Sequence, residues 1–319
     1  IVWQDSISGQ QCNEWNAASK ATVYKEDNQL YVVDAQGKKQ QLSTDGSREI
    51  VYGESVHRDE FGIEKGTFWS PDGQRLAFYR MDQSMVTDYP QVDINTRIAS
   101  YEPDKYPTAG ETSHQVTVGV YDITTNKTIF LNTPIIQNNQ NNQDTPVYFT
   151  NIAWSPDSKT IYMFELNRDQ NDCRLVSYDA ITGEKKAERY RETSEKYVEP
   201  MHPIQFLPWD DNLFILQSQR DGYNHLYLYN IKGELVKQLT IGTFVVQEVL
   251  GFNKKDKSII ISSNEANSIQ HNTYAVDIKT GKRTLLDNRK GSHHGVLSES
   301  GLYFYDKYSE PDVPRNIDL

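Results

Sequence analysis

The chain of 319 residues carries a formal net charge of −11 and has 20 Tyr, 11 Phe and 5 Trp, although only 37% of its residues are hydrophobic. This aromatic content argues against a disordered chain, and the acidic balance argues against nucleic acid as a partner, because phosphate neutralisation needs clustered Lys and Arg. The two cysteines, Cys12 and Cys173, are too few for a disulfide framework, and no stretch approaches the roughly 20 apolar residues that span a membrane.

One motif recurs along the chain. A run of aromatic or β-branched residues reaches Asp or Asn, a turn with Gly or Asn follows, and a second polar run completes the motif. It occurs at residues 30–42, 118–131, 175–184, 226–239 and 273–286. Because Gly and Asn tolerate the positive φ that tight hairpins require, each copy predicts a β-hairpin.

A second motif alternates with the first. An apolar or aromatic residue precedes a turn of the Ser-Pro-Asp-Gly kind, and an apolar strand follows, at residues 68–79, 153–164, 206–216 and 251–261. Such turns join one strand to the next one outward. The two motifs together repeat every 40 to 60 residues or so, which is roughly the period of four-stranded propeller blades. A β-sandwich also has alternating strands but gives no reason for this repeat, so we predict an all-β protein, a β-propeller spanning residues 1–319.

Two segments interrupt the repeat. Residues 81–115 form a long insertion that is too aromatic for a plain linker, and it could pack over a propeller face. Residues 137–143 are all Asn or Gln, which predicts a solvated surface loop.

Four stretches carry a resemblance to a known family. They are GTFWSPDG (66–73) followed by LAFYRMD (76–82), YPTAG (106–110) followed by VTVGVY (116–121), QRDGYNHLYLY (219–229) and VHRDEFGIEKG (56–66). Together they resemble the N-terminal β-propeller of the dipeptidyl peptidase IV family of serine peptidases (S9B). The last stretch is most similar to bacterial dipeptidyl aminopeptidases IV and prolyl tripeptidyl peptidases.

The resemblance implies a longer protein. An intact domain of this family is expected to have eight blades, so we expect this chain to be a fragment that lacks one or more upstream blades and a downstream α/β-hydrolase domain. That domain supplies a Ser-Asp-His triad with its nucleophile on a Gly-x-Ser-x-Gly turn. The nearest match here, GSHHG at residues 291–295, has His in place of the nucleophile. We therefore expect no catalytic residue and no cofactor in this chain.

The resemblance also implies a binding site for the substrate's α-amino group, with Asp59 and Glu60 as the matching acidic pair. Two carboxylates can satisfy the three donors of an ammonium group, and a fixed anchor selects which carbonyl reaches the nucleophile. The dipeptidyl members commonly carry two Glu at these positions. Because Asp59 stands in place of the first Glu, the sequence leaves open whether the protein releases dipeptides or tripeptides. Arg58 lines the same cavity or neutralises its neighbours. From the residues alone, both acids are ordinary loop acids paired with Arg58 or Lys65.

Other candidate sites have structural interpretations. His57 lacks a fitting second pair of metal ligands, so we predict no metal site. His293 and His294 are expected in a surface turn, and the segment from Arg220 to His225 in a blade turn with internal hydrogen bonds. The aspartates of the Pro-Asp turns are expected to form those turns.

Two main functions follow. The first is the non-catalytic propeller of a prolyl-specific exopeptidase that releases di- or tripeptides, gates access and anchors the substrate. Its partners would be peptides with Pro or Ala before the scissile bond and its own hydrolase domain, in a periplasmic, secreted or cell-surface protein that is a possible homodimer at full length. The alternative is a stand-alone propeller that binds proteins as a scaffold. A propeller enzyme acting on sugars would need opposed carboxylates around the axis.

Overall fold

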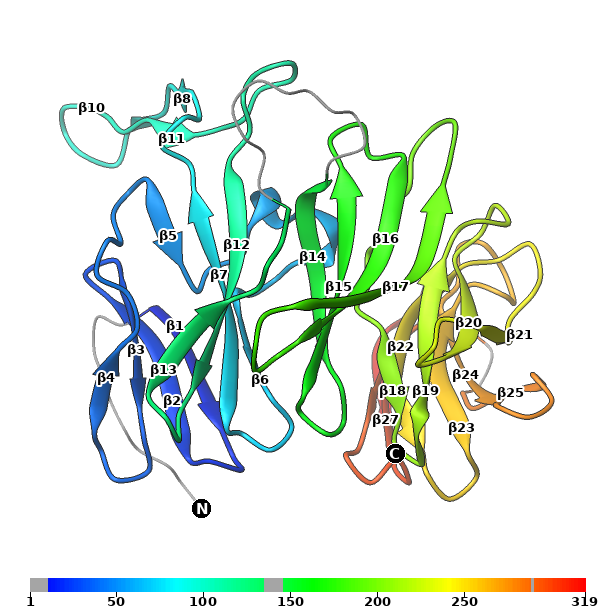
Figure 1. Cartoon of the computed structure of the whole chain (residues 1–319). Helices are drawn as coiled ribbons and strands as arrows, with labels where there is room; N and C mark the ends of the chain where they lie inside the picture. The colour runs from blue at the N-terminus through cyan, green and yellow to red at the C-terminus, as the bar shows by residue number, and fades with distance from the viewer. Residues whose placement is uncertain (1–10, 135–145, 288–289) are drawn as a thin grey trace. The chain divides into compact units, whose positions relative to one another are not determined.

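The protein, seen in a computed structural model, is described over residues 11–134, 146–287 and 290–319. This part of the chain consists of 28 strands and one 3₁₀ helix, η1 (Figure 1). It divides into two compact units. The first unit comprises residues 1–188 and 193–197, and the second comprises residues 189–192 and 198–319. None of the described residues form a helix that is long and apolar enough to cross a membrane.

The first unit begins with a four-stranded antiparallel sheet, paired in chain order, of β1 (Gln11–Asn16), β2 (Ala21–Glu26), β3 (Gln29–Val33) and β4 (Lys39–Gln41). The turn between β2 and β3 has two residues, Asp27 and Asn28, with φ angles of 48° and 65°. Asp and Asn are the non-glycine residues that best tolerate this conformation. Alternate residues of the hairpin are buried in the core: Ala21, Val23, Leu30 and Val32.

The next sheet has five strands: β5 (Ile50–Tyr52), β6 (Thr67–Trp69), β7 (Arg75–Asp82), β12 (Gln115–Asp122) and β13 (Lys127–Phe130). β12 lies between β13 and β7, and β5 and β6 both pair with the other edge of β7, one after the other along its length. Residues 53–66 therefore leave the sheet between two halves of one edge strand. They contain η1 (His57–Gly62), and we call residues 57–62 the acidic loop.

The insertion between β7 and β12 forms two short strand pairs. β8 (Asp88–Tyr89) pairs with β11 (Asp104–Lys105), and β9 (Val92–Asp93) pairs with β10 (Ser100–Tyr101). The aromatic insertion predicted at residues 81–115 is thus a narrow hairpin with exposed apolar side chains at its far end: Val92, Ile94, Ile98 and Tyr101. The Asn- and Gln-rich run at 137–143 lies outside the described residues.

The following sheet has four strands in chain order, namely β14 (Pro146–Trp154), β15 (Thr160–Asn167), β16 (Asp172–Asp179) and β17 (Lys185–Thr193). All eight residues of β15 are buried. A strand paired on both edges and covered on both faces requires side chains that tolerate burial at every position.

The second unit repeats the same plan. Its strands are β18 (Gln205–Leu207), β19 (Asp210–Ser218), β20 (His225–Asn230) and β21 (Leu235–Gln238), then β22 (Val246–Asn253), β23 (Ser258–Ser263), β24 (Asn272–Asp277) and β25 (Arg283–Leu285), then β26 (Ser292–Leu297), β27 (Phe304–Glu310) and β28 (Val313–Asp318). Each set pairs antiparallel in chain order.

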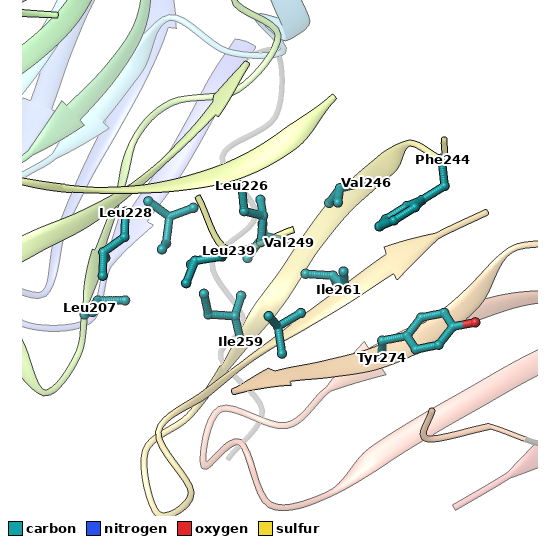
Figure 2. Close-up of a cluster of buried hydrophobic side chains, with 12 residues drawn as sticks. Leu207, Leu226, Leu228, Leu239, Phe244, Val246, Val249, Ile259, Ile261 and Tyr274 are labelled. Carbon is teal, nitrogen blue, oxygen red and sulfur yellow. The ribbon is translucent and has the colours of Figure 1, made fainter. Parts of the chain in front are cut away.

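The core of the second unit lies between two of these sheets. Alternate residues of β20, Leu226 and Leu228, meet alternate residues of β23, Ile259 and Ile261 (Figure 2). Strands with period-two burial on facing sheets give the interdigitated layers expected of stacked blades. The predicted all-β fold of four-stranded blades is confirmed.

Candidate functional site

The backbone of the acidic loop has an unusual conformation. His57, Arg58, Asp59 and Phe61 have φ angles of 57°, 60°, 62° and 60°. Left-handed backbone costs an L-residue with a Cβ roughly 1–2 kcal/mol, so several in a row persist only where tertiary contacts impose them. η1 appears as the blue coil beside β14 in Figure 1.

Two buried aromatic side chains attach the loop to the sheets. His57 accepts a hydrogen bond at Nε2 from the Phe149 amide (3.2 Å), and its Nδ1 lies 2.8 Å from Nε2 of His114. The Phe61 ring packs 5.4 Å from the ring of Tyr148, and its carbonyl accepts a 3.0 Å hydrogen bond from Asn151 Nδ2. His57 and Phe61 therefore point inward and leave the three residues between them facing solvent.

Those three residues are the predicted binding residues, and all are exposed. Asp59 accepts a hydrogen bond from Ser55 Oγ. Arg58 Nη1 lies 2.9 Å from Asp104 Oδ2, and its guanidinium lies 5.2 Å from the centre of the Tyr106 ring. Among the residues that the structure describes, the Glu60 carboxylate has no hydrogen-bond or ion-pair partner. Arg58 therefore pairs with the insertion rather than with its two acidic neighbours, and Glu60 is the carboxylate available for a ligand.

A pocket of about 510 Å³ opens beside the loop, lined by Glu14, Gly53, Glu54, Ser55, Glu64, Lys65, Gly66 and Thr67. Glu14 pairs with Lys65 (2.7 Å) and accepts a hydrogen bond from Thr67, and Glu54 pairs with Lys25. Ser55, which bonds Asp59, lies on the wall of this pocket. Two of the three glutamates that line the pocket are therefore already neutralised by lysines.

His114, Asp104 and Tyr148 were not predicted as parts of the site. His114 directly precedes β12, Asp104 belongs to β11 and Tyr148 belongs to β14. They are 46 to 91 residues away in sequence from the loop residues that they contact. The one sequence signal for these contacts was the aromatic character of the insertion, and it did not identify Asp104 as a contact residue.

The other sequence candidates are structural, with one correction. Asp72 and Asp157 each accept a hydrogen bond from the Ser two residues earlier and from an amide two residues later, which confirms their role in the turns. Arg220 stacks 3.5 Å from the Tyr227 ring centre, and His225 is buried with hydrogen bonds to Thr240 and Gly242, so this segment is held internally as predicted.

The prediction that His293 and His294 lie in a surface turn is wrong, because both residues belong to strand β26. His293 is 2% exposed on β26, and its Nδ1 lies 2.6 Å from Asp306 Oδ2 on the paired strand β27, whereas His294 is exposed. The strand alternation buries one of the two histidines, and a carboxylate partner offsets the cost of desolvating it.

No three metal-binding side chains lie together within the described ranges. Cys173 is buried in β16, and the side chain of Cys12 lies outside the described part.

Repeated four-stranded antiparallel meanders, one of them interrupted at an edge strand by the exposed acidic loop, define a propeller-type domain. The chain belongs to the family described as "Dipeptidyl peptidase IV (DPP IV) N-terminal region", which matches residues 3–315.

Several relatives are similar over nearly the whole chain. A "Probable dipeptidyl-aminopeptidase B" of Phaeosphaeria nodorum is 28% identical over 93% of this chain and 35% of its own length. A solved structure of a "putative dipeptidyl aminopeptidase IV" from Bacteroides ovatus is 44% identical, with a TM-score of 0.87 over 98% of this chain and 45% of that one. Porphyromonas gingivalis dipeptidyl peptidase 4 shares the fold, with 24% identity and a TM-score of 0.86 over 98% of this chain and 44% of its own. The chain thus spans less than half the length of these proteins.

Proposed function

We propose that this chain is the substrate-binding propeller of a prolyl-specific exopeptidase that releases di- or tripeptides, and that the acidic loop binds the α-amino group of the substrate. The observation that carries the proposal is the exposed Glu60 carboxylate, which lacks a partner in the described part of the chain. An ammonium group needs such an acceptor, and a charge-assisted hydrogen bond is about twice as strong as a neutral one.

The three loop residues would have unequal roles. Glu60 would be the principal acceptor, and Asp59 a weaker one because Ser55 already donates to it. Arg58 would act indirectly, since its guanidinium is engaged by Asp104 and Tyr106. A substrate whose amino end is fixed in this way presents only its second or third carbonyl to a nucleophile at a set distance. This is positioning, and no proton transfer is required of the loop.

The rest of the proposal concerns the full-length protein. The relatives' names support peptidase activity, for which an α/β-hydrolase domain would supply the nucleophile. Peptides with Pro or Ala before the scissile bond would be the substrates, and a periplasmic or cell-surface location and a homodimer would suit such an enzyme.

The test compares wild type with Glu60→Gln in the full-length protein, on Ala-Pro and Ala-Ala-Pro chromogenic substrates. Loss of one partner of a desolvated charge pair costs about 2–5 kcal/mol, so kcat/KM should fall by at least about 30-fold on the substrate whose length fits. Glu111→Gln, which removes the same charge from an exposed residue of the insertion, is the matched control and should stay near wild type. If kcat/KM of Glu60→Gln stays within about threefold on both substrates, the loop is not the anchor.

A further inference from the structure

Two histidines lie back to back beneath the acidic loop. His57 is 3% exposed and His114 is 4% exposed, and their rings stack with centres 4.9 Å apart. The Phe149 amide donates to His57 Nε2, so that nitrogen carries a lone pair. The proton of a neutral His57 is then on Nδ1, which donates to His114 Nε2 at 2.8 Å. The three groups form one chain of hydrogen bonds with a single allowed direction.

The surroundings of the pair favour neutral rings. Burial lowers the pKa of His57 well below its usual value, and the neighbouring His114 lowers it further. Burial lowers the pKa of His114 to about 4, with a contribution from the positive charges of Arg168 and Arg58. Of these two cations, Arg168 hydrogen-bonds the Tyr148 hydroxyl and Arg58 belongs to the loop itself. The ring of Tyr148 lies edge-on to the ring of His57, with ring centres 5.0 Å apart, and adds to its burial.

The pair connects the loop to two strands that are distant in sequence. His57 is the first residue of the loop and one of its left-handed residues, Phe149 belongs to β14, and His114 directly precedes β12. Backbone in this conformation relaxes unless contacts hold it. Of the contacts on the loop, the histidine pair acts where the left-handed run begins.

We propose that His114 is a positioning residue that, through its hydrogen bond from His57, holds the acidic loop in its left-handed conformation and so sets the place of Glu60. The part concerning Glu60 rests on the proposed function, whereas the part concerning the loop does not.

The test uses three variants of the full-length protein. His114→Leu leaves the buried Nδ1–H of His57 without an acceptor, whereas His114→Gln places a carbonyl oxygen near the position of the lost Nε2. His294→Leu, at an exposed histidine, is the control. Two quantities are measured: hydrogen–deuterium exchange of residues 57–62 and of the Phe149 amide, and kcat and KM on the substrate that responds to Glu60→Gln.

The expected result has three parts. In His114→Leu, exchange of these amides rises at least about tenfold, and KM rises by a similar factor while kcat stays within about threefold, because uniform binding is lost. His114→Gln restores both quantities, and His294→Leu changes neither. If His114→Leu fails to fold, His114→Gln is compared with His114→Met instead. Both new side chains are unbranched, but only that of Gln is a strong hydrogen-bond acceptor.

Two outcomes overturn the inference: unchanged exchange in a folded His114→Leu or His114→Met variant, or a folded His114→Gln variant that exchanges as fast as the variant without an acceptor. If Glu60→Gln has no effect on activity, the proposed function fails, and the exchange comparison alone still decides whether the histidine pair holds the loop.

Discussion

Replacing Phe61 by alanine should distinguish two contributions to the stability of the protein, the packing of the acidic loop and the strain in its backbone. Phe61 is 3% exposed, and truncation of a buried Phe costs about 3–5 kcal/mol in an ordinary core. Four residues of the loop are left-handed at roughly 1–2 kcal/mol each. If the loop relaxes when its inner side chain is lost, about half of that strain, on the order of 2–4 kcal/mol, is recovered. We therefore expect a net loss near 1 kcal/mol and no larger than about 3 kcal/mol.

Phe78→Ala is the matched control. Phe78 is fully buried in β7, in extended backbone without a positive φ, so its truncation should cost the full 3–5 kcal/mol or so. Urea denaturation of both variants gives the two losses, and hydrogen exchange reports the loop. Phe61→Ala should exchange faster at residues 57–62, and Phe78→Ala should not. Equal losses of stability, with exchange of the loop unchanged in Phe61→Ala, would refute the idea that Phe61 holds a strained loop in place.

Two further predictions concern stability. Ile261 is fully buried in the core of the second unit (Figure 2), so Ile261→Ala should lower the free energy of unfolding by about 2–5 kcal/mol in urea denaturation. Ile241 is 65% exposed, so Ile241→Ala should lower it little, and comparable losses in the two variants would contradict the assigned core. Stability should also fall with pH below about 6.5, because the unfolded chain takes up protons that native His57 and His114 exclude, at about 1.4 kcal/mol per pH unit for each histidine. For His114 this loss ends near pH 4, where the native residue also titrates. His114→Gln should reduce the slope between pH 6 and 5 by about one proton, and an unchanged slope would show that His114 titrates normally in the native state.

Local sequence determined the repeated elements of this protein. Each hairpin motif places Asp or Asn before a turn, and its side-chain oxygen can accept hydrogen bonds from the turn amides, as that of Asp122 does from Thr124 and Thr125. Such information lies within a few residues, so the strands, the turns and the blade repeat could be predicted without any knowledge of distant contacts. Glu60 is exposed, and its role as a binding residue stays a prediction.

Tertiary structure alone decided how the acidic loop is built. The hydrogen bond between His57 and His114 joins residues 57 apart, and the ion pair between Arg58 and Asp104 joins residues 46 apart. His57 and Asp59 tolerate a left-handed backbone better than most L-residues, but the local pattern does not predict a run of such residues, which contacts with distant segments, including β14 and His114, hold in place. His293 is a similar case, because its burial depends on the pairing of β26 with β27 and on the carboxylate of Asp306. Sequence determined the elements, whereas contacts between distant segments determined which of their polar side chains are held and which remain open to a ligand.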